Sequence, residues 1–462
     1  MLITFATLAL LTLFLGLAAC GAWLLWRGRG RWRLAGAALL LEGLLALAAQ
    51  ALLSTYPVGI GEPLIRVPFA ATLLQAAATL AAVIGVGALV VWLARWAARR
   101  FATGGRRGAA FGALLVSLPL IAGLALYGLL VASTPVRERE RNPGKRQITL
   151  PRGFTWSIYA EGTMDNPTCM AFGPDGNLYI GDIAGDLWLA KDTNGDKHID
   201  SITKFADGFQ LLVGLAWRGN DLYAASAGKI EVLRDTNGDG VADQRRTIVE
   251  GLPSMILRPH TNGAIAFGPD GRLYFGVGST TNGDYEPNPL AAAVLSVNPD
   301  GSDLKVFARG FGNTFGVAFN RDGALFGGDN SSGDEPDEFN QIVEGGNYGY
   351  PYFYGDPPKN LGTIGPLATF PAHSSPTGVA FYGGAQFPKE YRDNAFVALW
   401  NRGEVARIEV AKTTGGQYLS RTSTFASGFL YPLAVTTGPD GDLYVADFGT
   451  TAIYRISYTP GP

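Results

Sequence analysis

The chain contains three histidines, and one of them stands where a catalytic base would be useful. His260 lies in the segment Arg258–Ala264, directly before an apolar stretch at 265–267 that is typical of a β-strand. An imidazole titrates near neutral pH, so a histidine that faces a central channel could take a proton from a substrate hydroxyl. His198 is expected in solvent, and His373 either lines the same channel or packs in a loop. His260 is therefore the strongest candidate base.

Two acidic loops have the spacing of cation ligands. Both place oxygen-bearing side chains at positions 1, 3, 5 and 9, as the first part of an EF-hand-type calcium loop does. The candidate ligands are Asp192, Asn194, Asp196 and Asp200 in the first loop, and Asp235, Asn237, Asp239 and Asp243 in the second. Thr203 and Arg246 replace the acid at position 12, and Lys197 replaces the glycine at position 6 of the first loop. We predict structural Ca²⁺ mainly in the second loop; the alternative is an Asn-Gly turn whose aspartates cap backbone amides.

The elements that must position these residues come from a repeated phrase. In each copy, apolar residues precede a tight turn, most often Pro-Asp-Gly, and an apolar pair that usually ends in Tyr or Phe follows the turn. Six copies begin at Met170, Leu215, Ile265, Val317, Gly378 and Val435, and the fifth is degenerate. They start roughly 45–60 residues apart, which suits one four-stranded blade per copy. The sequence predicts an all-β six-bladed propeller over residues 148–458, with the aromatic residues packed between blades.

Residues 1–135 have the composition of a membrane anchor. Four apolar runs are each long enough to cross a bilayer, which takes about 20 residues. These runs are Leu2–Trp26, Leu34–Leu53, Phe69–Trp96 and Ala109–Ala132. The loops after the first and third runs are rich in arginine, so the positive-inside rule places them in the cytoplasm. We expect an all-α four-helix transmembrane bundle, a linker over residues 136–147, and a propeller on the extracytoplasmic side of the plasma membrane.

Charge and cysteine content exclude other classes of function. The formal net charge is −2, and the soluble half has no basic run beyond Arg137–Arg146, so no nucleic-acid partner is expected. Cys20 and Cys169 lie in different regions, and no CxxC spacing indicates a metal or redox site.

Four segments of the propeller resemble a known family. They are Phe267–Ser279 after His260, Ala308–Gly316, Asp329–Asn340 and Gly345–Pro351. In this order they are similar to segments of the soluble quinoprotein (PQQ-dependent) glucose and sorbosone dehydrogenases. The last two are close to that family's DE-N-I-GGNYGWP block. The resemblance covers about residues 148–458 and leaves the membrane half untouched.

The resemblance implies a role for each matched residue. His260 would remove a proton from the sugar hydroxyl while hydride passes to the quinone, and Asn313 would contact PQQ. Thr377 would lie near the cofactor, and Asn401 and Arg402 fall where the family has a basic contact to a PQQ carboxylate. Glu338 and Tyr348 match positions that hold a structural Ca²⁺. The loop at 329–336 corresponds to the one whose carbonyls hold the Ca²⁺ that polarises PQQ.

The chain departs from the family pattern at two cationic positions. Gly312 replaces an arginine and Asn401 replaces a lysine, so Arg309 and Arg402 are the nearby cations that could substitute. Our leading hypothesis is a PQQ- and Ca²⁺-dependent dehydrogenase that oxidises a sugar or related alcohol or aldehyde and passes electrons to a quinone or cytochrome. One alternative is a non-catalytic, calcium-stabilised binding or sensor propeller. Another is a lactonase-like hydrolase with a central metal held by Asp329, Asn330 or Asn347.

Overall fold

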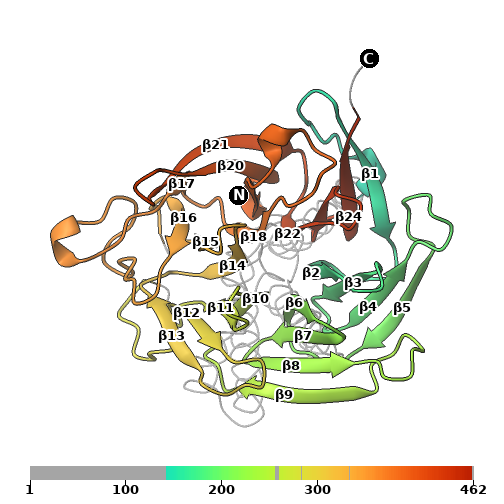
Figure 1. Ribbon diagram of the computed structural model, residues 1–462, viewed down its shortest axis with the longest axis horizontal. Coiled ribbons are helices and arrows are strands. Elements are labelled where there is room, and N and C mark those ends of the chain that lie inside the picture. The colour runs from blue at the N-terminus through green and yellow to red at the C-terminus, as the bar shows by residue number, and fades with distance from the viewer. Residues whose placement is uncertain (1–141, 255–259, 282, 332, 460–462) are drawn as a thin grey trace, which may run out of the picture. The chain divides into compact units, whose positions relative to one another are not determined.

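The structure, a computed structural model, describes residues 142–254, 260–281, 283–331 and 333–459. These residues form six four-stranded antiparallel sheets that surround a central axis like the blades of a propeller (Figure 1). The predicted six-bladed propeller is confirmed, with one blade for each copy of the repeated phrase.

Each blade has four strands. In blades 1 to 5 the strands follow one another along the chain from the innermost to the outermost, whereas blade 6 takes its outermost strand from the start of the domain. Blade 1 contains β2 (Pro167–Phe172), β3 (Leu178–Asp182), β4 (Leu187–Lys191) and β5 (Ser201–Ala206), and blade 2 contains β6 (Leu212–Arg218), β7 (Asp221–Ser226), β8 (Lys229–Arg234) and β9 (Gln244–Glu250). Blade 3 contains β10 (Asn262–Phe267), β11 (Leu273–Val277), β12 (Ala293–Val297) and β13 (Lys305–Arg309), and blade 4 contains β14 (Thr314–Phe319), β15 (Leu325–Asp329), β16 (Asp337–Ile342) and β17 (Ala368–Phe370). Blade 5 contains β18 (Pro376–Phe381), β19 (Ala395–Leu399), β20 (Glu404–Lys412) and β21 (Tyr418–Ser427), and blade 6 contains β22 (Pro432–Thr437), β23 (Leu443–Asp447), β24 (Ala452–Tyr458) and β1 (Phe154–Glu161).

Blade 6 joins the two ends of the propeller domain. Its outermost strand, β1, comes first in the chain and pairs antiparallel with β24, which comes last. Phe154 lies opposite Tyr458 in this pair. The ring is therefore closed by backbone hydrogen bonds that join the two ends of the propeller domain within one blade.

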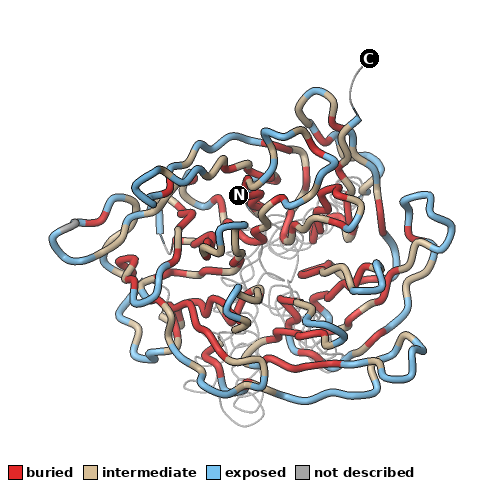
Figure 2. Tube along the Cα trace, in the orientation of Figure 1, coloured by how far each residue is buried: buried red, intermediate tan, exposed pale blue. Residues whose placement is uncertain are grey.

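Burial falls from the inside of each blade to the outside. The second strands, such as β3 and β11, are buried along their whole length, whereas the outermost β9 is mostly exposed. Figure 2 shows the same gradient, with exposed backbone concentrated at the rim and in the loops. The apolar alternation of the repeated phrase thus builds a core within and between neighbouring blades.

The aromatic residues of the repeat join neighbouring blades, as predicted. The contacting rings are edge-on or tilted, at centroid separations of 4.8–5.2 Å. The pairs are Tyr179 with Trp217, Tyr223 with Phe267, Tyr274 with Phe319, Phe326 with Phe381, and Tyr444 with Phe172. The pattern fails between blades 5 and 6, because the last copy has Thr437 where the others have Phe or Trp.

The antiparallel order gives the propeller two distinct faces. One face, called the turn face, carries the turns that follow the innermost strands, including the Pro-Asp-Gly turns. The other, called the site face, carries the loops that lead into the innermost strands and those that follow the second strands. His260 and Asn313 precede β10 and β14, so both belong to the site face.

The predicted membrane anchor over residues 1–135 and the linker up to residue 141 lie outside the described residues. In the described ranges the helices are short 3-10 turns, and none has the length and apolar character needed to cross a membrane. These turns are η1 (Pro143–Lys145), η2 (Lys359–Leu361), η3 (Lys389–Tyr391) and η4 (Trp400–Arg402).

Candidate active site

His260 is held at the site face by a backbone carbonyl. It is half-buried and lies two residues before β10, and its Nδ1 is 3.0 Å from the carbonyl oxygen of Ser279. A carbonyl oxygen only accepts hydrogen bonds, so the imidazole proton belongs on Nδ1 and the basic lone pair on Nε2. This tautomer gives Nε2 the chemistry of a general base.

Gly278 brings His260 and Asn313 together. A Cβ atom placed on Gly278 would lie 2.4 Å from Asn313 Oδ1 and 3.1 Å from His260 Cβ, so only glycine fits between the two side chains. The residues lie on different blades and are 53 positions apart in the sequence. The structure thus places the predicted base and the predicted cofactor-contacting amide on either side of one glycine.

Asp329 fixes the loop that carries Asn313. Its carboxylate accepts hydrogen bonds from the backbone amides of Gly312 at 2.9 Å and Asn313 at 2.8 Å, and from the Thr314 hydroxyl at 3.0 Å. Burial, and then the nearby Glu338, raises the pKa of Asp329 to about 8. Three donors bind this carboxylate, so its observed role is to anchor the loop, and a central metal at Asp329 stays an untested alternative.

Glu338 lies beside Asp329 in the β15–β16 pair and is buried. Its carboxylate accepts hydrogen bonds from the Gly355 amide at 2.7 Å and from the Asn340 amide group at 3.0 Å, and burial raises its pKa. Asn340 is fully buried, and its Oδ1 has no hydrogen-bond partner within the described structure. A hard cation such as Ca²⁺ would suit the buried oxygens of the Glu338 carboxylate and Asn340 Oδ1. The predicted Ca²⁺ contact of Glu338 stays a prediction.

Tyr348 uses its hydroxyl group elsewhere. That hydroxyl donates to the Gln341 carbonyl at 2.5 Å and accepts from the Val343 amide at 3.0 Å, while the ring stacks on Phe311. Burial raises the pKa of Tyr348 to about 12. A calcium contact at this position would therefore come from its backbone carbonyl.

The predicted cationic contacts are only partly available. Arg402 pairs with Glu404, with both nitrogen–oxygen distances at 3.2 Å, and the Asn401 amide group donates to the His373 carbonyl at 3.1 Å. Arg309 ends β13, is exposed, and has no carboxylate partner among the described residues. At Gly312 a Cβ atom would lie 2.5 Å from the Asn330 carbonyl oxygen, so the backbone leaves no room for the family's arginine. Of the two candidate arginines, Arg309 is therefore the one without a carboxylate partner among the described residues.

Three comparisons with known proteins address the same region. A family model described as "Domain of unknown function (DUF7133)" matches residues 142–348. An uncharacterized protein of Borreliella burgdorferi is 28% identical over 353 residues, covering 67% of this chain and 91% of the relative. Quinoprotein glucose dehydrogenase B of Acinetobacter calcoaceticus is 23% identical over 244 residues, covering 41% of this chain and 50% of the enzyme. A solved structure from Thermus thermophilus, described as a putative oxidoreductase (glucose dehydrogenase), is 25% identical with a TM-score of 0.55, and the match covers 66% of this chain and all of that one.

The propeller resembles the quinoprotein sugar dehydrogenases. The resemblance inferred from the motifs is therefore confirmed for the propeller. Two further solved structures whose descriptions name PQQ, at 18% and 20% identity, add agreement in fold.

Thr377 and His373 have local partners on the site face. The Thr377 hydroxyl donates to the carbonyls of Ala398 at 3.3 Å and Pro432 at 3.5 Å, which links blades 5 and 6. The equivalent residue of blade 1, Thr168, links blades 1 and 2 in the same way. The predicted cofactor contact of Thr377 stays a prediction. His373 is exposed, and its Nε2 lies 2.9 Å from Asp334 Oδ1.

The two acidic loops lie at the turn face, away from His260. They connect β4 to β5 and β8 to β9. In the second loop, Asp235 accepts hydrogen bonds from the amides of Gly238 and Gly240, and in the first, Asp192 accepts from those of Gly195 and Lys197. These are the capping contacts of the alternative interpretation. Within the described residues, no three His, Cys, Asp or Glu side chains are grouped to hold a metal ion, so calcium in these loops stays a prediction.

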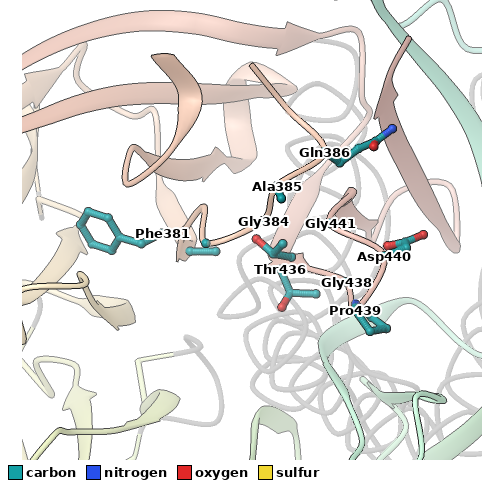
Figure 3. A pocket seen from close by; sticks show the side chains of 12 residues that line it. Phe381, Gly384, Ala385, Gln386, Thr436, Gly438, Pro439, Asp440 and Gly441 are labelled. Carbon is teal, nitrogen blue, oxygen red and sulfur yellow. The ribbon is translucent and has the colours of Figure 1, made fainter. Parts of the chain in front are cut away.

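A hollow of about 770 Å³ opens at the turn face between β18 and β22 (Figure 3). It lies where Thr437 interrupts the aromatic packing between blades, and the buried Thr437 hydroxyl has no hydrogen-bond partner in the described structure. Most of its other lining residues belong to the loops Gly383–Gln386 and Gly438–Gly441. The hollow lies on the opposite face from His260, so it takes no part in the candidate active site.

Sequence reasoning missed the residues that surround the Ser279 carbonyl. Ser279, Tyr350 and Glu286 form a hydrogen-bonded group next to His260. The one available signal was Tyr350, which replaces the tryptophan of the family's GGNYGWP block.

Proposed function

We propose that this chain is a PQQ-dependent dehydrogenase that oxidises a sugar or a related alcohol or aldehyde. The observation that carries the proposal is the meeting of His260 and Asn313 at Gly278, with the proton of His260 on Nδ1. The likeness to proteins described as glucose dehydrogenases supports the same chemistry.

Each residue would supply a separate interaction. When bound, PQQ supplies the two-electron acceptor that amino-acid side chains lack. His260 Nε2 would take the proton from the substrate hydroxyl, and the Asn313 amide would hydrogen-bond to the cofactor. Arg309 would pair with a cofactor carboxylate, because a guanidinium binds carboxylates strongly. The residues present therefore offer the cofactor a base and an amide at one glycine, and Arg309 is an exposed cation without a carboxylate partner among the described residues.

Calcium would complete the site. The Glu338 carboxylate and the unpartnered Asn340 Oδ1 are buried oxygens of the kind that Ca²⁺ binds. A bound divalent cation would offset the cost of burying the neighbouring Asp329 and Glu338 carboxyl groups. The second acidic loop, Asp235–Asp243, would hold a separate structural ion at the turn face.

We also propose where the propeller acts relative to the membrane. The apolar runs of residues 1–135 would anchor the chain in the plasma membrane, and the propeller would act on the extracytoplasmic side. Electrons would then pass to a membrane quinone or a cytochrome. An alkaline phosphatase fused after Pro462 should be active in cells, because that enzyme requires export; an inactive but stably produced fusion would reject this location.

The test of the proposed activity is sugar-dependent dye reduction by the full-length chain with PQQ and Ca²⁺. Removing the base in His260→Ala should lower the rate by about 10²–10⁴-fold, the usual contribution of a general base. His373→Ala is the matched control, since this histidine also lies on the site face but is exposed and should leave the rate unchanged. Equal rates in all three proteins would reject His260 as the base.

A second candidate function is a binding propeller without a cofactor. The small number of available cationic side chains favours it. Asn401 stands where the family has lysine, and Arg402 is already paired with Glu404. A chain that binds no PQQ but is still stabilised by Ca²⁺ would support this alternative.

A further inference from the structure

Ser279 is held from three sides next to His260. It is 1% exposed, and its amide donates to the Gly312 carbonyl at 2.8 Å. Its hydroxyl lies 2.5 Å from the Tyr350 hydroxyl and 3.2 Å from Glu286 Oε2. Its carbonyl is the group that meets His260 Nδ1. The residue that sets the imidazole tautomer is thus itself fixed by the side chains of Glu286 and Tyr350.

The hydrogen bonds around Ser279 can form one chain of donors that leads from Tyr350 through Ser279 to Glu286. The Gly283 amide donates to the Tyr350 hydroxyl at 2.6 Å and the Thr281 amide donates to Ser279 Oγ at 3.1 Å, an arrangement in which the Tyr350 proton can bind Ser279 Oγ. The Ser279 hydroxyl can then donate to Glu286, whose carboxylate also accepts from the amide and hydroxyl of Thr280, both at 2.6 Å. A chain of donors that ends on a carboxylate is reinforced along its length and resists rotation of any one member.

Tyr350 supplies the hydroxyl on which this arrangement depends. The quinoprotein pattern has tryptophan at this place, and an indole offers a single N–H donor and no oxygen acceptor. Tyr350 is 8% exposed, and its amide donates to the Gly310 carbonyl at 3.0 Å, so its backbone is tied to the loop that leads to Asn313. Its hydroxyl therefore joins the Asn313 side of the site to the His260 side.

We propose that Tyr350, Ser279 and Glu286 are positioning residues for His260. Together they fix the Ser279 carbonyl against Nδ1, which keeps the proton on Nδ1 and aims the Nε2 lone pair. The inference rests on the proposed function for its catalytic meaning, but the tautomer itself is a property of the cofactor-free chain.

The test uses Tyr350→Phe and Ser279→Ala in the full-length chain. Each removes one hydroxyl and keeps the fold of the backbone. Tyr352→Phe is the matched control, because Tyr352 is two residues away and 69% exposed. Nitrogen NMR of ¹⁵N-histidine-labelled protein without cofactor reports the tautomer directly, and His260→Ala assigns the signal among the three histidines.

We expect native protein and Tyr352→Phe to hold the His260 proton on Nδ1. We expect Tyr350→Phe and Ser279→Ala, called the cluster variants, to show mixed tautomers. With PQQ bound, the cluster variants should lose roughly 10- to 100-fold in kcat while KM and PQQ affinity stay within about twofold, as for a misaligned base. Unchanged His260 signals in both folded cluster variants would overturn the proposal. If native protein binds no PQQ, the proposed function fails, whereas the NMR result still decides the positioning role.

Discussion

The turn face repeats one contact, whereas the contacts that hold His260 at the site face occur once. At the turn face, the tyrosine of the repeat donates to the aspartate of its own turn in blades 1, 3 and 6, at 3.2, 2.8 and 2.9 Å. At the site face, the side-chain contacts of His260 and Tyr350 have no counterpart in the other blades as far as the structure describes them. The repeat therefore builds the scaffold, and the loops that depart from it carry the proposed chemistry.

One arrangement, an aspartate that anchors loops through their backbone amides, does recur at the site face. An aspartate ends the second strand of blades 1, 4 and 6 as Asp182, Asp329 and Asp447, and each accepts backbone amides of nearby loops. Asp447 accepts from Leu430 and Tyr431 at 2.8 Å, just as Asp329 accepts from Gly312 and Asn313. The irregular loops thus rest on a repeated anchor.

Among changes that keep both His260 and Asn313, the largest effect should come from the site face at Gly278, where these two residues lie closest to one backbone position. Gly278→Ala would place a methyl group 2.4 Å from Asn313 Oδ1 and push the amide away from His260. We expect dye reduction to fall by roughly 100-fold, because displacements of about 1 Å cost this much. Gly383→Ala at the turn face, where a Cβ meets nothing within 4 Å, is the control and should keep full activity. Normal activity in Gly278→Ala would contradict the site as described.

The anchor Asp329 should make stability depend on pH. Its pKa is raised to about 8 in the folded chain, so the folded state holds a proton that the unfolded chain loses near pH 4. The contribution is therefore fully present below pH 4 and is lost as the pH rises toward 8. Urea unfolding in EDTA should show a free energy of unfolding that falls across this range, and Asp329→Asn should flatten the fall. An identical pH slope in both proteins would refute the assignment.

Restoring the repeat at the turn face should stabilise the propeller. Thr437→Phe would supply the missing aromatic residue between blades 5 and 6 and fill part of the hollow. We expect the free energy of unfolding to rise by about 1 kcal/mol, as for other cavity-filling changes. Thr437→Val separates the two causes, since it removes only the unpartnered hydroxyl. A lower melting temperature for Thr437→Phe would mean that the hollow cannot admit the ring.

The smallest effect concerns the ion pair between blades 1 and 6. Lys197 Nζ lies 3.4 Å from Asp440 Oδ2, and the lysine side chain is 47% exposed. Lys197→Gln should lower the free energy of unfolding by less than about 1 kcal/mol, and 1 M salt should remove the difference. A larger, salt-independent loss would show that Lys197 has a further role in closing the ring.

The sequence predicted the scaffold because its evidence is local. The repeated phrase contains both the turn and the packing residues of each blade, so six copies predict six blades. The pairing of His260 with Asn313 was available only through the family resemblance, since no spacing rule joins residues 53 positions apart. The contact of Ser279 with Tyr350 spans 71 positions and depends on the path of the segment after β16, which no local pattern specifies. Lys197 stands at the glycine position of the first acidic loop, and its backbone adopts the positive φ, 69°, that the position requires.

PQQ binding by the full-length chain is the property on which the proposed dehydrogenase activity depends most directly. An equilibrium titration in Ca²⁺ buffer, followed by the absorbance of the cofactor, would measure this without relying on a substrate. We predict saturation at one PQQ per chain, with weaker binding in Arg309→Gln and unchanged binding in His373→Ala. Absence of binding at micromolar PQQ in a folded, calcium-loaded protein would contradict the dehydrogenase and favour a binding propeller.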